Sequence, residues 1–270
     1  MERFQTKKSL GQHFLNSAVV PRWLSDAGEV GKGDLIVEIG PGTGALTREL
    51  LARGAKVLAL EADHRAIEVL ESEFSLEIAA GQLSIVHADA RKLDLESLGL
   101  QDHSFKVVAN IPYYLTGQLF RSFLEGPVQP SQLVFLVQKE VAKRATESIG
   151  KGGKESLLSL SLQAFGRPIY VREVGKGHFT PMPKVDSAII AVAEVSRKRF
   201  KSYTTKEFFE ILHLGFGSKR KQLIGNLSKT YAREELLKIF QNLGFSPDVR
   251  AEDVSIDRWL DLVEALKGKR

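Results

Sequence analysis

Residues 37–47 read Val37-Glu38-Ile39-Gly40-Pro41-Gly42-Thr43-Gly44-Ala45-Leu46-Thr47. A β-branched run that begins at Leu35 ends here in three alternating glycines, and a helical pattern follows up to Arg53. Glycines at such a point tighten the turn from strand to helix and let a ligand approach the backbone closely. A strand, a glycine-rich turn and a helix in this order are typical of a ligand-binding parallel sheet.

The same alternation of strand and helix continues on the carboxyl side of this stretch. The chain has apolar, strand-like runs at residues 35–39, 56–60, 83–86, 105–109 and 133–137, with helical patterns at 45–53 and 63–74. This spacing predicts an α/β fold with a parallel sheet. Two later runs, 168–174 and 188–195, are joined by a Gly/Pro-rich loop, so we expect an antiparallel end to the sheet.

The pattern changes after a basic break at residues 196–201. Only helical patterns follow, at 206–216, 219–227, 233–243 and 257–266. The 270 residues are therefore divided into a sheet domain, 1–195, and a small all-helical domain, 196–270. The second domain has 16 Lys and Arg against 10 Asp and Glu, a net charge of +6, while the first has −1. Such a localised excess indicates a polyanionic partner, and a merely solvated lysine-rich face is the alternative.

Composition excludes several classes of protein and site. Hydrophobic residues make up 43% and charged residues 26%, the ordinary globular balance. There is no cysteine and the six histidines are scattered, so we expect neither disulfides nor a metal site. The chain has no apolar run long enough to span a membrane, and its first residues lead into no signal core. We expect a soluble, cytoplasmic protein.

The glycine turn favours one of two cofactors. Gly40, Gly42 and Gly44 fit the G-x-G-x-G turn of S-adenosylmethionine sites fully, and fit the dinucleotide pattern only loosely. Glu38 also favours S-adenosylmethionine, because an acidic group suits a cationic amino acid better than a pyrophosphate. A structural turn without a ligand is the remaining alternative.

Two carboxylates follow the next two strands. Glu61 ends the run at 56–60, where a carboxylate can accept hydrogen bonds from ribose hydroxyls. Asp89 follows the run at 83–86, where it can accept a hydrogen bond from an adenine amine. We predict that these residues and their neighbours Ala62 and Ala90 belong to the cofactor site. Asp63 instead suits the N-cap of the following helix.

Asn110-Ile111-Pro112-Tyr113-Tyr114 follows the fourth strand. An exocyclic adenine amine is a poor nucleophile, because its lone pair is delocalised into the ring. A site that methylates it must accept both N–H groups, and the Asn110 side chain and the Ile111 carbonyl can do so. Pro112 fixes the backbone, and Tyr113 offers a ring on which a flipped base can stack. A strand-ending turn with a buried tyrosine is the structural alternative.

Asn110-Ile111-Pro112-Tyr113 resembles the N-(I/L)-P-Y motif of adenine-N6 methyltransferases. Three further segments are similar to motifs of the small-subunit (16S) rRNA adenine N6,N6-dimethyltransferase family: Lys8-Ser9-Leu10-Gly11-Gln12-His13-Phe14-Leu15, Phe179-Thr180-Pro181-Met182-Pro183-Lys184-Val185-Asp186-Ser187 and Phe216-Gly217-Ser218-Lys219-Arg220-Lys221-Gln222-Leu223. The resemblance covers nearly the whole chain, in family order. It implies a Rossmann-like S-adenosylmethionine-dependent methyltransferase sheet followed by a basic, helical RNA-binding domain.

The resemblance also implies a reaction and further site residues. S-adenosylmethionine would donate four methyl groups to two adjacent adenosines in the 3′-terminal hairpin loop of small-subunit rRNA, during assembly of the 30S ribosomal precursor. His13 and Leu15 would contact the cofactor together with Gly40, Glu61, Asp89 and Asn110, although many relatives have Asn where this chain has His13. Phe179 would form the wall of the base pocket opposite Tyr113; without the family, a Phe beside prolines is predicted to be a core residue. Lys219, Arg220 and Lys221 would bind RNA, and we expect a monomer.

Three other functions remain open from the sequence. A large-subunit rRNA adenine methyltransferase of the macrolide-resistance type shares Asn-Ile-Pro-Tyr, but the Lys-Val-Asp-Ser loop and the long basic domain argue against it. A non-catalytic RNA-binding assembly factor would not need the intact Asn110, Pro112 and Tyr113. A NAD-dependent oxidoreductase would need a Tyr-x-x-x-Lys or His–Asp arrangement, which the chain lacks.

Overall fold

The computed structural model describes residues 13–148, 150, 152–218 and 220–269, which form two compact units. The first contains the described residues up to Lys143 and Arg167–Val195, and the second contains Arg144–Gly166 and the described residues from Ser196 onward. The sequence places 144–166 in the first domain, whereas the structure groups this segment with the second unit. Packing explains the difference, because the Phe165 ring lies 5.0 Å from that of Phe200 and 6.1 Å from that of Phe209.

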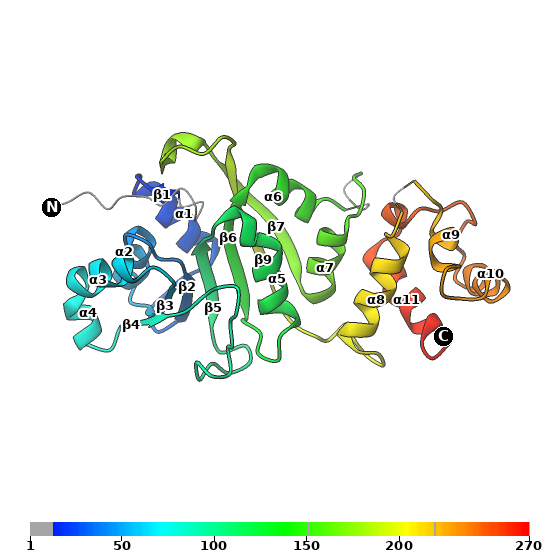
Figure 1. The fold of residues 1–270 in the computed structure, drawn as a ribbon, viewed down its shortest axis with the longest axis horizontal. Coiled ribbons are helices and arrows are strands. Elements are labelled where there is room, and N and C mark those ends of the chain that lie inside the picture. Colours follow the sequence, from blue (N-terminus) through cyan, green and yellow to red (C-terminus); the bar gives the residue numbers. More distant parts are fainter. Residues whose placement is uncertain (1–12, 149, 151, 219, 270) are drawn as a thin grey trace. The chain divides into compact units, whose positions relative to one another are not determined.

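A seven-stranded sheet forms the centre of the first unit, in the order β4-β3-β2-β5-β6-β9-β7 (Figure 1). Its strands are β2 (Leu35–Ile39), β3 (Lys56–Glu61), β4 (Leu83–His87), β5 (Lys106–Asn110), β6 (Gln132–Gln138), β7 (Arg167–Val174) and β9 (Ser187–Ala193). Strands β4, β3, β2, β5 and β6 are parallel, and β9 is antiparallel to both β6 and β7. The predicted α/β class, the parallel strands and the antiparallel end are confirmed.

Helices cover both faces of this sheet. The helices of the first unit are α1 (Val19–Ala27), α2 (Ala45–Ala52), α3 (His64–Glu73), α4 (Ser75–Ala79) and α5 (Thr116–Glu125). Helix α6 (Lys139–Thr146) begins in the first unit, and its residues from Arg144 belong to the second. Val134 and Leu136 of β6 belong to the buried cluster that contains α1. Phe135 between them contacts Phe120 of α5, with ring centroids 5.1 Å apart. Neighbouring side chains of a strand point to opposite faces, so β6 has to be continuously apolar.

Helices make up the regular structure that is described in the second unit. They are α7 (Leu157–Phe165), α8 (Thr205–Gly215), α9 (Leu223–Leu227), α10 (Arg233–Asn242) and α11 (Ile256–Leu266). The helix predicted at 219–227 begins only at Leu223, because Gln222 before it has an extended backbone with ψ 149°. Arg220 and Lys221 therefore lie in the turn that precedes α9. None of the helices described in either unit is both long and apolar enough to cross a lipid bilayer.

A small second sheet joins the described part of the N-terminal motif, His13 to Leu15, to the Phe179 loop, while residues 8–12 of the motif lie outside the described residues. Strand β1 (Phe14–Leu15) pairs antiparallel with β8 (Phe179–Thr180), and neither strand was predicted from the sequence. The Asn16 N–H donates to the His178 carbonyl at 3.1 Å, and the Asn16 amide donates to Thr180 Oγ1 at 3.0 Å. Two segments more than 160 residues apart in the sequence are thus fixed side by side.

Candidate active site

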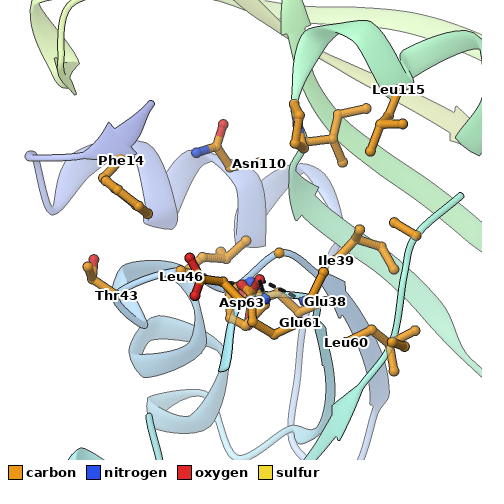
Figure 2. A pocket seen from close by; sticks show the side chains of 18 of the residues that line it. Phe14, Glu38, Ile39, Thr43, Leu46, Leu60, Glu61, Asp63, Asn110 and Leu115 are labelled. Carbon is orange, nitrogen blue, oxygen red and sulfur yellow. Dashed lines mark hydrogen bonds between the residues drawn. The ribbon is translucent and has the colours of Figure 1, made fainter. Parts of the chain in front are cut away.

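A cavity of about 920 Å³ lies at the carboxyl ends of β2, β3, β4 and β5 (Figure 2). This volume lies within the range of small-molecule and cofactor sites. The structure brings together twelve of the predicted residues in its lining: His13, Leu15, Glu38, Gly40, Gly42, Glu61, Ala62, Asp89, Ala90, Asn110, Pro112 and Tyr113. Gly44 and Phe179 are absent from this lining.

The glycine turn presents bare backbone to the cavity. Gly40 and Gly42 have left-handed backbone angles, φ 64° and 58°, which glycine adopts without strain. A Cβ on Gly40 would meet nothing within 4 Å, so a ligand can approach its main chain directly. A Cβ on Gly42 would stand 2.7 Å from the ring of Phe14. Glycine is thus required at Gly42 for Phe14 to lie against the turn.

Gly44 serves packing. Its φ is 78°, and a Cβ there would lie 2.5 Å from the ring of Phe74 and 3.0 Å from Leu70. Phe74 follows α3 and is 2% exposed. The third glycine of the pattern therefore lets α2 begin close against α3, and the structure gives it no place in the cavity.

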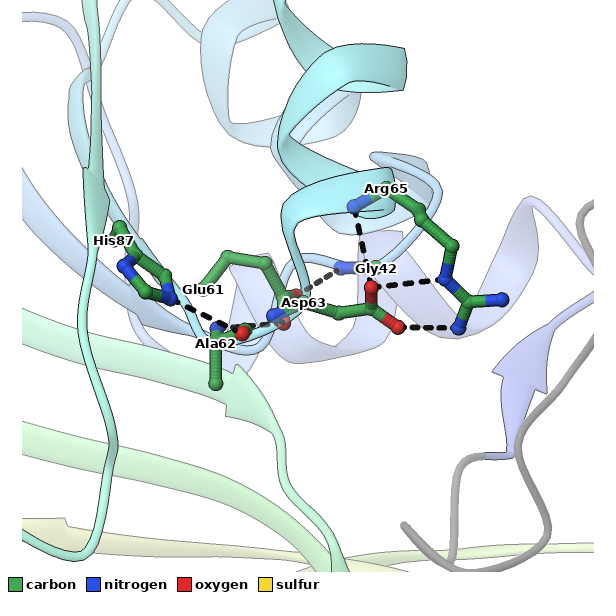
Figure 3. Close-up of polar contacts among 6 residues, drawn as sticks. All are labelled: Gly42, Glu61, Ala62, Asp63, Arg65 and His87. Carbon is green, nitrogen blue, oxygen red and sulfur yellow. Dashed lines mark hydrogen bonds and ion pairs between the residues drawn. The ribbon is translucent and has the colours of Figure 1, made fainter.

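Glu61 holds the turn to the end of β3 (Figure 3). Its Oε2 accepts from the Gly42 N–H at 3.2 Å, and its Oε1 accepts from the N–H groups of Ala62 at 2.8 Å and Asp63 at 2.9 Å. A carboxylate has about four acceptor positions, so one remains for a ribose hydroxyl. Asp63 caps α3 as predicted, because its side chain accepts from the Arg65 N–H.

Glu38 is a buried carboxyl in the wall of the cavity, with 1% of its surface exposed. Burial raises the pKa of Glu38 to about 8; the hydrogen bond from Thr47 Oγ1, 2.7 Å long, opposes this and the charge of Glu61 adds to it. The site thus has a carboxyl that is held neutral near pH 7 and that a bound cation would ionise.

Asp89 is anionic over the physiological range. The Arg91 guanidinium and main-chain N–H donate to its two oxygens, at distances from 2.6 to 3.0 Å, and lower the pKa of Asp89 to about 2. Arg91 thus makes two contacts with each oxygen of Asp89 at the cavity wall. The contact of Asp89 with an adenine amine stays a prediction. Arg91 also lines the cavity, and the sequence did not single it out.

Asn110 ends β5, and its orientation is fixed by the N-terminal segment. Its Nδ2 donates to the main-chain carbonyl of His13 at 3.1 Å. His13 Nδ1 lies 2.7 Å from the Pro181 carbonyl, so residue 13 also connects Asn110 to the Phe179 loop. In Figure 2, Asn110 and Phe14 lie on one side of the cavity and Glu38 and Glu61 on the other.

Tyr113 is held inward by two contacts. Its hydroxyl is 2.6 Å from Oγ of the buried Ser187, and its ring stacks on that of His13 with centroids 5.8 Å apart. Burial raises the pKa of Tyr113 above its ordinary value, against the Ser187 hydrogen bond. The ring therefore remains a neutral phenol in the cavity wall.

Phe179 is not part of the described cavity wall. It is 2% exposed and packs in the core cluster with Val174 and Ile189. The structure thus gives it the core position expected of a Phe beside prolines. Its place in a base pocket, which only the family resemblance implied, stays a proposal.

Two aromatic residues of the cavity were missed in the sequence. Phe14 lies inside the N-terminal motif, between the predicted His13 and Leu15, and its contact with Gly42 could not be read from spacing. Tyr114 lines the cavity beside Tyr113 and is 62% exposed. Its signal was the repeated tyrosine after Pro112.

The predicted RNA cluster lies in the second unit. Arg220 and Lys221 are exposed in the turn before α9. Lys219 lies outside the described residues.

These features fit S-adenosylmethionine. The open main chain at Gly40 accommodates a close ligand, and the neutralised Glu38 can accept a cationic amino acid group. Glu61 has an acceptor position left at the end of β3, and Asp89 places a carboxylate beyond the end of β4, where a nucleoside would extend from the glycine turn. The cavity thus has room and carboxyl groups for the amino group and the nucleoside of this cofactor.

Known proteins resemble the chain over nearly its full length. The family model described as ribosomal RNA adenine dimethylase matches residues 3–268. The "Ribosomal RNA small subunit methyltransferase A" of Dehalococcoides mccartyi strain CBDB1 is 36% identical over 96% of this chain and 87% of its own length. The protein of the same name from Fusobacterium nucleatum is 31% identical over 98% of this chain and 99% of its own.

Two solved structures share the fold. A dimethyladenosine transferase from Plasmodium falciparum has a TM-score of 0.80 at 23% identity, covering 95% of this chain and 98% of its own. The 23S rRNA methyltransferase ErmE has a TM-score of 0.70 at 24% identity, covering 94% and 99%. The match of the family model and the identity to whole-length relatives lead to one conclusion: this chain belongs to the ribosomal RNA adenine dimethylase family.

Proposed function

We propose that this enzyme dimethylates N6 of two adjacent adenosines in the 3′-terminal hairpin loop of small-subunit rRNA. The chain is an rRNA adenine dimethyltransferase whose methyl donor is S-adenosylmethionine. The choice of these two adenosines rests on the resemblance of the motifs. The single observation that best supports the chemistry is the Asn110–His13 hydrogen bond.

This bond decides which atom of Asn110 is free to act. A carbonyl oxygen only accepts, so the amide must turn its Nδ2 toward His13 and leave Oδ1 for a substrate N–H. The Ile111 carbonyl can accept the second N–H, and Pro112 between Ile111 and Tyr113 adds no competing donor. With both hydrogens accepted, the amine nitrogen is drawn toward tetrahedral geometry and its lone pair is freed.

The remaining catalytic effect is orientation. When bound, S-adenosylmethionine supplies a methyl group already activated by its sulfonium. The carboxyl groups of Glu38, Glu61 and Asp89 lie at or just beyond the ends of three neighbouring strands, and they align a ligand along the edge of the sheet toward Asn110 at the end of β5. Tyr113, fixed by Ser187 and His13, offers a rigid ring for the flipped base.

The second unit is proposed to hold the RNA. Residues 196–270 have the net charge of +6, and Arg220 and Lys221 are exposed there with Lys219 beside them in the sequence. We further propose that the enzyme works as a monomer on a 30S precursor, in the cytoplasm, where that substrate is assembled.

Methyl transfer to defined RNA tests this proposal. Radiolabelled S-adenosylmethionine is supplied with small ribosomal subunits that lack the modification, with large subunits, and with small subunits whose two adenosines are replaced. Four methyl groups per small subunit, and none on the other two substrates, are expected. Labelling of large subunits would support the macrolide-resistance type of enzyme, and binding without labelling would support a non-catalytic assembly factor.

A further inference from the structure

Tyr114 stands at the mouth of the cavity and is not used by the mechanism above. It is the only exposed Phe, Tyr or Trp in the part of the chain that the structure describes, with 62% of its surface accessible. The Tyr114 side chain has no hydrogen bond or ring contact with another described residue. Burying so large a ring is favourable, and a ring left open beside a cavity is available to stack on what enters there.

The two neighbouring tyrosines differ in their surroundings. Both belong to the 3₁₀ turn η2 (Tyr113–Leu115), which α5 continues. Tyr113 is fixed by Ser187 and His13, whereas Tyr114 is open to solvent at the rim. Successive residues thus present one ring inside the cavity and one at its mouth.

The loop after β4 holds the positively charged Arg91 at the cavity that Tyr114 also lines. Gln118 of α5 donates to the Arg91 carbonyl at 2.6 Å, which ties this loop to the helix that follows Tyr114. The Nε–Nη2 edge of the guanidinium faces Asp89, and Nη1 has no partner among the described residues. An aromatic ring and a cation held together are the usual elements of a single-stranded RNA contact.

We propose that Tyr114 is the stacking platform for the nucleobase next to the adenosine that enters the cavity, with Arg91 contacting the phosphate between the two. This rests on the proposed function and deepens it. Adjacent nucleotides are joined by one phosphate, so a base inside the pocket leaves its neighbour at the rim. The platform thereby holds the second of two adjacent adenosines while the first reacts.

Single-turnover methylation measured against RNA concentration tests the platform. Tyr114→Ala should raise the RNA concentration that gives half-maximal rate about 5- to 100-fold, as loss of one base–aromatic stack does. The rate at saturating RNA and the affinity for S-adenosylmethionine should stay unchanged. Tyr114→Phe should behave as the wild type. Leu76→Ala, at an exposed site on α4 away from the cavity, is the matched control.

An RNA with an abasic residue beside the target adenosine provides the second arm. With the wild type, the half-maximal RNA concentration should rise on this RNA by the same factor by which Tyr114→Ala raises it on intact RNA. With Tyr114→Ala, the abasic RNA should cause no further rise. The proposal would be overturned by equal half-maximal concentrations for wild type and Tyr114→Ala on intact RNA. It would also be overturned if the effects of the variant and of the abasic RNA were independent, so that their factors multiply. If the wild type does not methylate the hairpin at all, the proposed function has failed instead. Should Tyr114→Ala not fold, quenching of 2-aminopurine at the neighbouring position, compared between wild type and Tyr114→Leu, decides the same question.

Discussion

The side-chain amide of Asn110 donates to the main-chain carbonyl of His13 across 3.1 Å. The two residues are 97 positions apart in the chain, and the bond lets the first described segment set the orientation of the Asn110 side chain. Because the bond is to main chain, a His or an Asn at position 13 serves it equally well. The His13 side chain is used elsewhere, at the Pro181 carbonyl and the Tyr113 ring.

Replacing Asn110 tests the chemical step. Asn110→Ala removes an acceptor that matters most as the amine becomes tetrahedral, so the single-turnover rate should fall about 10²- to 10³-fold, while RNA affinity changes little. Asn110→Asp keeps an acceptor but loses the donor to His13, so it should retain more activity than Ala and less than the wild type. A wild-type rate for Asn110→Ala at saturating cofactor and RNA would make Asn110 a turn residue only.

Glu38 should make the stability of the protein without cofactor depend on pH. Its pKa of about 8 lies above the unfolded value of 4.5, so the unfolded chain releases this proton first as pH rises. The stability that the protonated Glu38 contributes to the folded state is complete below pH 4.5, and it is lost as the pH rises from 4.5 to 8. Glu38→Gln keeps a neutral acceptor for Thr47, and should raise the free energy of unfolding at pH 8 by on the order of 2–4 kcal/mol relative to wild type. Denaturant titrations of wild type and Glu38→Gln at pH 4.5 and 8 measure this effect. An equal difference in unfolding free energy between the two proteins at both pH values would refute a buried neutral carboxyl.

The glycines of the turn should separate into two classes. Gly44→Ala forces a Cβ to within 2.5 Å of Phe74 and should cost about 2–4 kcal/mol of stability. Part of that loss should be recovered in the double variant with Phe74→Leu. Gly40→Ala meets no atom and should cost only about 1–2 kcal/mol of backbone strain. Calorimetry should show weakened S-adenosylmethionine binding for Gly40→Ala and unchanged affinity in folded Gly44→Ala.

Salt dependence tests the basic cluster in the second unit. Replacing Lys219, Arg220 and Lys221 by Ala should weaken rRNA binding and reduce the log–log salt slope by about 0.7–0.9 for each phosphate that is no longer neutralised. Cofactor affinity should not change. The control is Lys206→Ala with Lys238→Ala, two exposed cations of the same unit outside the cluster. An identical slope in both variants would mean that the cluster is only a solvated surface.

Local pattern was sufficient for the seven strands of the main sheet and for the place of the predicted cofactor residues at strand ends. Apolar runs indicated the strands, and the carboxyl ends of parallel strands necessarily bring Glu38, Glu61 and Asp89 to one edge of the sheet. Distant contacts were not readable. Gly44 and Phe74 are thirty positions apart, so their packing leaves no mark on the G-x-G-x-G spacing, which assigned Gly44 to the cofactor.

The same limit explains the other differences. The pairing of β1 with β8 has no periodicity to reveal it, since each strand has two residues. The basic segment before α9 looked helical because helix and turn share polar, charged residues. Burial of Leu223 and its hydrogen bond to Val249, 26 positions later, place the start of the helix instead.

The strand order has a consequence for how this protein folds. Strand β2 lies between β3 and β5, so its neighbour on one side is separated from it by about seventy residues of chain, as in the pairing of Ile36 with Lys106. Contacts between residues close in sequence form early, and pairings that close a long loop form late. The entropy cost of closing the loop has to be met before the strand pairing compensates for it. The Asn110 side of the cavity can therefore exist only once that crossover has closed. A molecule that fills the cavity therefore binds only the fully assembled sheet. It should slow the global unfolding of the first unit and not merely protect one loop.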